Sequence, residues 1–497
     1  MGIKRYYANK DNTITNAFEA NLTTRGTGSN MGAADILEVF SIYGQVSSSS
    51  GLTTEKSRAI IEFDTTQIST SRTSGEIPAS GSVNFYFKLY NAKHGQTLPK
   101  QFNLVVAPIS QSWTEGVGLD MENYSDIGVS NWISASEGTA WTEQGGDFLT
   151  GSGVPTGSQF FDVGTEDLEV DVTTIIEEWL DGTRPNYGLG VFLTSSEEDS
   201  TSRSYYTKKF FARSSEFFFK RPIIEARFAP TVFDDRGQFY YSSSLAPAAD
   251  NLNTVYLYNR IRGRLVNIPS IGTGPIYVSV FSGSSTTPTG SALTLVADGT
   301  NVVSGNETIV TGSHVSTGIY KATFAITAAA TPLEYLHDVW HNGNLTTQFT
   351  TGTIEPLTFG ASSDEFTERY LNNITNLKPV YEPDETAQFR VYTRPRNWSP
   401  TIYTVANARP ETTIIPSSSF SIFRLQDNLK IIPFGTGSDL ETLLNYDQRG
   451  NYFELDIGML EPDYGYGIQL CHYNEYTGKW DVQPAVFKFR VEKRQAE

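Results

Sequence analysis

Hydrophobic and polar residues alternate in short runs along most of the chain, and Gly, Ser, Thr, Asn and Pro separate these runs. A period of two is typical of a half-buried β-strand, whereas an amphipathic helix has a period near 3.6. The pattern therefore predicts an all-β protein. The clearest predicted strands are residues 57–63, 83–90, 102–107, 189–193, 221–228, 276–281, 320–326, 387–392, 420–425 and 485–491.

One segment has helical spacing instead. The apolar residues of 173–180 share one face of a helix, Glu177 and Glu178 face outward, and Gly182 supplies a C-terminal turn. We expect this short helix to be the only convincing one in the chain.

Many short strands with almost no helix are typical of β-sandwiches and jelly rolls. The strand over 221–228 ends just before Pro230, and residues 242–251 form a run rich in Ser, Ala, Pro and Asp. A second polar stretch follows at 360–372. These breaks predict three domains, at residues 1–230, 231–358 and 359–497.

The composition narrows the class of function. The chain has 497 residues, with 55 Asp and Glu against 37 Lys and Arg, a net charge of −18. Nucleic-acid binding depends on basic side chains that neutralise phosphates, so no nucleic-acid partner is expected. One cysteine, Cys471, excludes an intramolecular disulfide. The N-terminus lacks the apolar run of a signal peptide, and no apolar stretch reaches the roughly 20 residues that span a bilayer. We expect no membrane partner.

Several segments of the first 230 residues form a collinear pattern over most of residues 30–228. They are 57–64 (SRAIIEFD), 111–116 (QSWTEG), 131–132 (NW), 168–174 (LEVDVTT), 186–191 (NYGLGV), 211–216 (FARSSE) and 221–228 (RPIIEARF). This pattern resembles the DNRLRE-type domain, a jelly-roll module of bacterial surface proteins and phage structural proteins. The resemblance implies fold-defining roles for Arg58, Trp113, Trp132, Asp171, Trp179, Gly188, Arg221 and Pro222.

The strand that Arg58 leads also has a clear alternation. Ile60 and Glu62 fall on one face, and Ile61 and Phe63 fall on the other. We expect the first face to be solvent-exposed and the second to be buried.

The later segments 320–324, 336–340 and 348–354 look like closing strands of an immunoglobulin-like sandwich, and 446–453 and 464–468 look similar. The predicted architecture is a jelly roll followed by two immunoglobulin-like sandwiches. This domain order is similar to that of structural proteins from tailed phages of marine cyanobacteria.

The resemblance implies a non-enzymatic virion structural protein of the neck, tail or baseplate, or one that decorates the particle. Its partners would be other virion proteins and copies of itself, and it would assemble in the host cytoplasm. The alternative is a bacterial surface adhesin or carbohydrate-binding protein, for which a host-surface glycan is the candidate partner. An adhesin must cross a membrane, so the missing signal peptide favours the virion protein.

Aromatic residues are unusually dense in residues 205–219, where five phenylalanines crowd around Lys208, Lys209 and Arg213. Two interpretations remain open, a protein–protein contact surface and a strand that is buried on both faces. The candidate subunit-contact residues are Tyr6, Tyr7, Phe217, Phe218 and Phe219.

Motifs for catalysis are missing. His337 and His341 are four residues apart, but the segment HDVWH lacks the glutamate of a metalloprotease helix. Cys471 and His472 are neighbours, so on a strand they point to opposite faces and cannot pair as nucleophile and base. No nucleophile elbow, Walker loop or dinucleotide fingerprint occurs. The sequence predicts no catalytic residue, no metal site and no cofactor.

Two acidic runs, 197–199 and 234–235, contain the oxygen ligands that calcium prefers, but neither has EF-hand spacing. We expect them to be solvated loop charges. Trp113, Trp132 and Trp141 suit either a sugar-stacking platform or core packing, and the family pattern favours the core.

Overall fold

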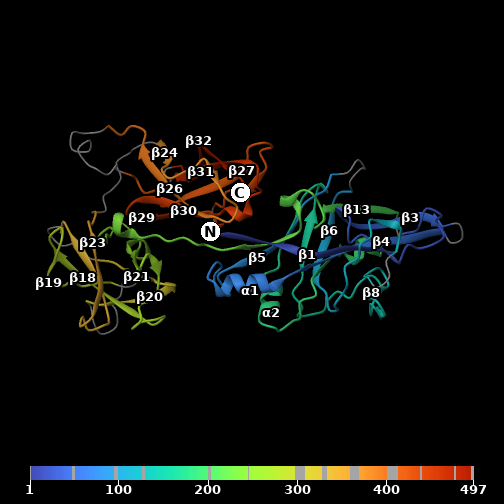
Figure 1. The fold of residues 1–497 in the computed structure, drawn as a ribbon, viewed down its shortest axis with the longest axis horizontal. Helices are drawn as coiled ribbons and strands as arrows, with labels where there is room; N and C mark the ends of the chain where they lie inside the picture. The colour runs from blue at the N-terminus through green and yellow to red at the C-terminus, as the bar shows by residue number, and fades with distance from the viewer. Residues whose placement is uncertain are drawn as a thin grey trace. The chain divides into compact units, whose positions relative to one another are not determined.

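The computed structural model describes residues 2–47, 51–93, 99–125, 129–199, 203–244, 246–296, 308–326, 333–358, 369–399, 412–436, 439–474 and 477–493. Figure 1 shows that the regular structure consists mainly of strands. Strands account for 48% of the structure and helices for 8%, which confirms the all-β prediction. All ten predicted strands are present, with ends that differ by a few residues. No helix of the described part is long and apolar enough to cross a bilayer.

The chain divides into two compact units, Met1–Ala229 and Pro230–Glu497. The predicted break at 360–372 falls largely on residues 359–368, which lie outside the described residues. The elements of the first unit are β1 Ile3–Thr15, β2 Ser29–Asn30, β3 Ile36–Ser47, β4 Gly51–Phe63, α1 Thr65–Thr73, β5 Asn84–Leu89, β6 Phe102–Pro108, β7 Asp120–Ser125, β8 Ser134–Ser136, β9 Thr139–Ala140, β10 Gly157–Phe161, β11 Leu168–Asp171, α2 Thr173–Leu180, β12 Leu189–Leu193, α3 Ser195–Glu198, β13 Ser204–Phe211, the 3-10 helix η1 Phe218–Lys220 and β14 Ile223–Arg227.

Strand β1 joins two groups of strands in the first unit. Its first half pairs with β14, from Ile3 opposite Arg227 to Tyr7 opposite Ile223. Its second half pairs with β4, and the register shifts after Ala8. The strand order is β10-β6-β12-β4-β1-β14-β5-β11, and β13 and β3 extend the sheet beside β4. A strand that changes partners in this way lets one sheet fold over the other as a sandwich.

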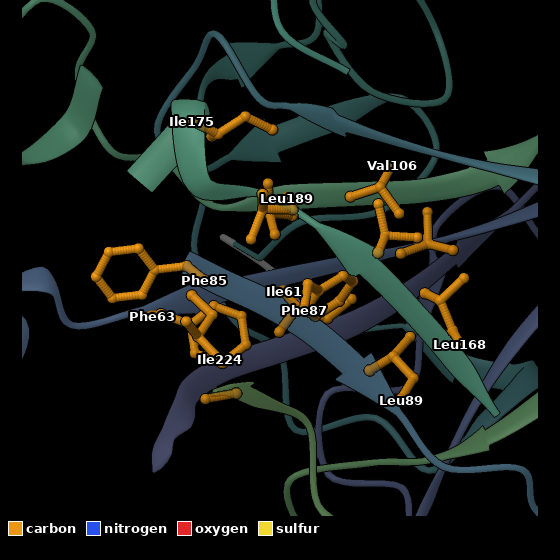
Figure 2. Packing of buried hydrophobic residues seen from close by; sticks show 14 of the residues in the cluster. Ile61, Phe63, Phe85, Phe87, Leu89, Val106, Leu168, Ile175, Leu189 and Ile224 are labelled. Carbon is orange, nitrogen blue, oxygen red and sulfur yellow. The ribbon is translucent and has the colours of Figure 1, made fainter. Parts of the chain in front are cut away.

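The main core of this unit lies between these two groups of strands. Figure 2 shows Ile61 and Phe63 of β4 beside Phe85 and Phe87 of β5. The rings of Phe63 and Phe87 meet edge to face, with centroids 5.8 Å apart. Burying such aromatic side chains supplies much of the stability of a sandwich that has no disulfide.

The opposite face of β4 is buried as well. Ile60 is completely buried in a second cluster with Trp113, Trp132 and Trp141. The expectation that Ile60 faces solvent is therefore wrong, because the loop segments that carry the three tryptophans cover this face. Glu62 on the same face stays at the edge and pairs with Lys10 at 3.0 Å.

The predicted helix is confirmed as α2, which spans the same residues, Thr173–Leu180. Helix α1 was not predicted, because its sequence TTQISTSRT contains a single large apolar residue, Ile68. Its start is explained locally, since the Asp64 side chain caps it by accepting a hydrogen bond from the Thr66 amide.

The second unit contains two groups of strands, each with its own core. Its elements are η2 Asp235–Gly237, η3 Ala248–Asn251, β15 Asn253–Tyr258, β16 Arg260–Ile261, β17 Arg264–Leu265, β18 Ile276–Gly283, β19 Pro288–Ala292, β20 Val310–Ser316, β21 Ile319–Phe324, β22 Leu336–His341, β23 Gln348–Ile354, β24 Tyr370–Ile374, β25 Val380–Tyr381, β26 Thr386–Pro395, β27 Ser418–Arg424, β28 Lys430–Ile432, β29 Asn445–Asp447, β30 Gly450–Asp456, η4 Ile457–Met459, β31 Gly465–Asn474 and β32 Lys479–Val491.

The first group has the order β15-β21-β20-β18-β22-β23, with β19 beside β18. Strand β20 pairs first with β18 and then with β21, so it joins two halves that enclose a core around Trp340 and Tyr320. The second group consists of two sheets, β24-β26-β30-β29 and β25-β32-β31-β27-β28. Phe453 of one sheet stacks on Phe420 of the other, with ring centroids 4.2 Å apart. Both groups are sandwich-like.

Candidate functional site

The structure divides the predicted contact residues into two sets. Tyr6 and Phe219 are only 3% and 6% exposed, so their assignment as surface contacts is wrong. Successive residues of a strand point to opposite faces, so Tyr6 enters the core while Tyr7 stays half-buried on the outer face. Phe217 is 48% exposed, and Phe218 is half-buried.

The residues that remain outside form two ring pairs, linked by the neighbouring residues Phe217 and Phe218, and we call them together the aromatic surface. It consists of Tyr7, Phe211, Phe217 and Phe218. The rings of Phe211 and Phe217 meet edge to face at 5.4 Å, and those of Tyr7 and Phe218 lie 4.8 Å apart. The cluster thus joins β1, the end of β13 and the turn that leads to β14.

Two cations adjoin the aromatic surface. Lys220 Nζ lies 5.1 Å from the centre of the Phe211 ring and 5.4 Å from that of Phe217. The Arg221 guanidinium lies 5.9 Å from the Phe218 ring. Cation–π attraction holds these side chains over the rings, so the surface combines aromatic and positively charged groups.

The turn between β13 and β14 holds the aromatic surface in place. Ser215 is buried, its hydroxyl accepts a hydrogen bond from the Phe217 amide at 3.2 Å, and its carbonyl accepts one from Arg221 Nε at 2.9 Å. The Lys220 amide donates to the Phe217 carbonyl at 2.9 Å. The buried Pro222 then begins the return to β14, at a position where no amide donor is needed.

The other face of β13 is buried, so the interpretation as a buried strand holds for this part of the aromatic segment, and the contact surface stays a prediction. Phe210 and Lys208 are completely buried. Lys208 Nζ donates to Asn91 Oδ1 at 2.7 Å and to the carbonyls of Gly164 and Glu166 at 2.9 and 2.7 Å. Burial lowers the pKa of this ammonium group to about 8. Here the aromatic residues pack around a satisfied internal lysine.

A network of charges covers the outer face of the neighbouring strands. Arg5 of β1 lies opposite Glu225 of β14 and pairs with it at 2.8 Å. Lys88 and Arg227 pair with Glu169 at 2.9 and 2.8 Å. Burial alone would raise the pKa of Glu225, but the neighbouring cations, Arg5 first among them, lower it to about 2. This network could not be predicted from the sequence, because its members come from four separate strands.

The acidic run 197–199 is not a solvated loop charge, contrary to expectation. Glu197 and Glu198 are 9% and 4% exposed. Arg58 holds Glu198 through two hydrogen bonds, at 2.5 and 3.1 Å, and Arg58 lies 5.3 Å from the Trp132 ring. Only Asp199 is exposed, and it pairs with Lys56 at 2.7 Å. The positive charge of Arg58 explains why Glu198 is buried, and Glu197 instead accepts a hydrogen bond from the Asn103 amide at 3.1 Å.

The second acidic run, 234–235, is also structural. Asp234 is 6% exposed and pairs with Arg236 at 2.8 Å, and Arg236 also holds the buried Asp338. Asp235 accepts hydrogen bonds from the Thr254 amide at 2.6 Å and from the Tyr446 hydroxyl at 2.8 Å. Burial raises the pKa of both aspartates to about 6. The expectation of solvated charges fails here too.

The three tryptophans do not form an exposed platform. Trp113, Trp132 and Trp141 are 2%, 5% and 4% exposed and share one cluster. The indole of Trp113 donates to the Tyr187 carbonyl at 2.8 Å, next to Gly188. A Cβ at Gly188 would lie 2.2 Å from the Ile61 carbonyl oxygen, and its φ is +91°, so the close approach of the two segments requires glycine there.

The remaining residues that the family resemblance marks are spread over the first unit. Asp171 is exposed and accepts a hydrogen bond from the Thr173 amide at 2.8 Å, at the start of α2. Trp179 of the same helix is buried in the main core. The structure therefore does not gather the marked residues into one site.

The buried histidines His337, His341 and His472 are internal hydrogen-bonding groups. His337 and His341 lie on β22 and are buried. His337 Nε2 bonds to the Ser284 carbonyl at 2.8 Å, and His341 Nε2 lies 3.1 Å from Ser279 Oγ. Cys471 is buried as expected, and burial raises its pKa to about 11. Within the part that the structure describes, no three His, Cys, Asp or Glu side chains lie together as metal ligands.

The sequence analysis did not identify a second charged feature, a hairpin of exposed arginines. The hairpin of β16 and β17 carries Arg260, Arg262 and Arg264, all exposed, and its turn has positive φ at Arg262 and Gly263. Among the described residues, none of the three arginine side chains has an ion-pair or hydrogen-bond partner. The alternating arginines in RIRGR were the available sequence indication, and the Arg-Gly pair marks the turn.

Comparisons with known proteins give no family. No protein-family model matches the chain. No curated protein matches it. Among solved structures, a marsupial T cell receptor is 8% identical, covers 52% of this chain and 72% of its own, and has a TM-score of 0.16. The N-terminal Ig1-2 module of the Drosophila receptor protein tyrosine phosphatase DLAR is 10% identical and has a TM-score of 0.13. The match covers 49% of this chain and 92% of that module. At these scores the likeness carries no conclusion about this chain.

Proposed function

We propose that this chain is a non-enzymatic structural protein of a tailed-phage virion, located at the neck, tail or baseplate or decorating the particle. In this proposal the first unit is a jelly roll of the DNRLRE type, and the two sandwiches of the second unit are immunoglobulin-like. Its partners are other virion proteins and further copies of the chain, and it assembles in the host cytoplasm. The support is the collinear sequence pattern together with an outward-facing contact surface.

The aromatic surface is the observation that carries the proposal. Contact residues that dominate binding energy are enriched in Trp, Tyr and Arg, and interface cores are enriched in Phe and Tyr. The cluster presents Tyr7, Phe217 and Phe218 with Lys220 and Arg221 beside them. A half-exposed phenylalanine held rigidly by a hydrogen-bonded turn loses little conformational entropy when a partner covers it.

The distribution of charge favours contacts with acidic proteins, including further copies of this chain. The chain has a net charge of −18, yet the aromatic surface and the β16–β17 hairpin both present cations. A positive patch on an acidic protein attracts the acidic surfaces of neighbouring subunits and repels other positive patches, which sets the orientation of docking. Repetition of one subunit in a particle suits such a contact.

The alternative of an adhesin that binds sugars on a tryptophan platform loses its main support. Trp113, Trp132 and Trp141 are buried in the core and present no face to a sugar. A surface adhesin of another design remains the competing function, and it predicts the protein on a bacterial envelope.

The experiment is incorporation of variants into particles. A phage that lacks this gene is complemented with the wild-type chain, with Phe217→Ser or with Tyr205→Ser, and copies per particle are measured by quantitative mass spectrometry. We expect Phe217→Ser to lower incorporation by about tenfold, since an aromatic contact contributes on the order of 1–2 kcal/mol. Tyr205 is the matched control, because it is 55% exposed at the other end of β13.

Thermal unfolding of both variants keeps the result interpretable. Phe217→Ser deletes the ring contact with Phe211 and is expected to cost about 1 kcal/mol, whereas Tyr205→Ser at an exposed position should cost no more than about 0.5 kcal/mol. Equal incorporation of Phe217→Ser and wild type would refute the role of the aromatic surface. A chain that never enters particles would refute the virion function itself.

A further inference from the structure

A separate pocket of about 220 Å³ lies at one end of the second group of strands in the second unit. Its walls come from Tyr370 at the start of β24, residues 413–417 before β27, and the adjoining ends of β31 and β32. Gln238, which follows η2, completes the lining. The volume is below the roughly 300–1,000 Å³ of pockets that hold drug-sized ligands, so it suits a single small ring.

Gln238 lines this pocket, and one atom of its side chain has no hydrogen-bond partner among the described residues. Gln238 Oε1 is buried and accepts no hydrogen bond from any described residue. An unsatisfied buried acceptor costs on the order of 1–3 kcal/mol, so such atoms are uncommon and call for an explanation. Gln238 is only half-buried, so a rotation of its side chain toward the pocket would let a ligand hydroxyl donate to this oxygen and satisfy it.

A fixed hydrogen-bond network holds the polar side of the pocket. His472 Nδ1 lies 2.8 Å from Ser418 Oγ, and His472 Nε2 lies 3.1 Å from Asn372 Oδ1. Asn372 in turn donates to Gln483 Oε1 at 3.2 Å. Burial lowers the pKa of His472 to about 4, so the ring is neutral at physiological pH. Both ring nitrogens of His472 therefore have hydrogen-bond partners, and these bonds hold the ring in a fixed position in the pocket wall.

The charge of the lining restricts the ligand. Asp481 is the only ionisable carboxylate among the lining residues, which include no lysine or arginine. Asn474 Nδ2 donates to Asp481 Oδ2 at 3.2 Å, which orients the carboxylate. A phosphate, sulfate or carboxylate ligand would meet this negative charge without a compensating cation. The pocket therefore favours an uncharged ligand with several hydroxyl donors.

Aromatic and apolar side chains supply the complementary part. Tyr473 is 37% exposed at the rim and packs against Trp480, with ring centroids 5.5 Å apart. The Tyr370 ring meets His472 edge to face at 5.6 Å. A pyranose ring has one apolar C–H face and a rim of hydroxyls, so it matches a pocket with aromatic walls and isolated acceptors.

We propose that this pocket binds one neutral pyranose residue of a glycan. Its hydroxyls donate to Gln238 Oε1 and to the Asp481 carboxylate, and its C–H face lies against Tyr473. The inference goes beyond the proposed virion function and does not depend on it, since it concerns a site in the second unit and not the aromatic surface of the first.

Saturation-transfer NMR on the full chain tests the proposal. The probes are glucose, galactose, mannose, N-acetylglucosamine and N-acetylgalactosamine at millimolar concentration, with N-acetylneuraminate and glucose 6-phosphate as charged comparisons. We expect transfer to the ring protons of at least one neutral sugar and weaker transfer to the charged ones. Gln238→Leu should lower the affinity about tenfold or more, because it removes an acceptor at the site.

The Gln238→Leu variant distinguishes a loss of sugar binding from a loss of folding. Gln238→Leu deletes an unsatisfied oxygen, so thermal stability should stay the same or rise while binding is lost. Gln388→Leu is the matched control, because Gln388 is exposed on β26 outside the pocket. No transfer to any of the neutral sugars, stronger binding of the charged sugars, or undiminished binding by Gln238→Leu would overturn the proposal.

Discussion

The buried carboxyl of Asp11 in β1 gives the sharpest test of the first unit. Asp11 is completely buried, and its Oδ2 accepts a hydrogen bond from the Arg213 amide at 2.5 Å. Its Oδ1 has no hydrogen-bond partner among the described residues. Burial raises the pKa of this carboxyl from 3.8 to about 7, and the charge of Glu115 adds to the effect. We expect the Asp11 carboxyl to take up a proton near neutral pH.

The sign of the effect follows from proton binding. Between pH 3.8 and 7 the folded chain holds a proton on Asp11 that the unfolded chain has lost, so the free energy of unfolding rises as the pH falls through this range. The full difference in pKa corresponds to about 4 kcal/mol, of which about 3 kcal/mol is gained between pH 8 and pH 5. The wild-type first unit is therefore penalised at pH 8.

The perturbation is Asp11→Asn, which carries no titratable group and resembles the protonated acid in shape. At pH 8 the variant should be at least as stable as the wild type. At pH 5 the wild type should have gained about 3 kcal/mol relative to the variant. Urea unfolding at both pH values, followed by hydrogen exchange of peptides from β1 and β4, reports on the first unit alone. Asp162→Asn changes an exposed aspartate of the same unit and should run parallel to the wild type. Parallel pH profiles for Asp11→Asn and wild type would refute the reasoning.

Three further substitutions test the packing of the first unit. Arg58→Met removes the closer of the two cations beside the buried Glu198 carboxylate and leaves Lys56 at 3.7 Å, so calorimetry should show a loss of about 3 kcal/mol; an unchanged melting temperature would contradict the buried ion pair. Gly188→Ala forces a side chain onto the Ile61 carbonyl at positive φ, and we expect a loss of at least about 2 kcal/mol in urea unfolding, where tolerance would disprove the close approach. Lys208→Met removes three hydrogen bonds from buried acceptors, and a loss of about 3 kcal/mol is expected, whereas an equally stable variant would show that these acceptors find other donors.

The strands could be predicted because each depends on its own residues. The alternation in the strand of Arg58 and the apolar face of the helix that contains Trp179 are local patterns. Each is sufficient to predict its own element. Helix α1 escaped prediction because a side-chain cap, and not an apolar stripe, marks its start at Asp64. Ile60 was assigned to solvent because the alternation cannot show that the tryptophan segments cover the second face of β4.

The candidate sites depend on contacts that are distant in sequence, and these set the limit of prediction. Glu198 looks like a loop charge until Arg58, 140 residues earlier, is placed beside it. Tyr6 and Tyr7 are neighbouring residues of the same type. Only the direction of each side chain on β1 distinguishes the core residue from the surface residue. The pocket proposed to bind a sugar combines Gln238 with the ends of β31 and β32, and no local sequence pattern connects these segments.

The measurement that tests the central claim most directly is mass spectrometry of gradient-purified particles from the lysate whose DNA encodes this chain. A virion structural protein predicts its tryptic peptides in the particle band, at a few to a few dozen copies for the neck, tail or baseplate and at hundreds for decoration. Absence from the particles, with the chain found on the bacterial envelope or in the medium, would contradict the virion function and favour the adhesin.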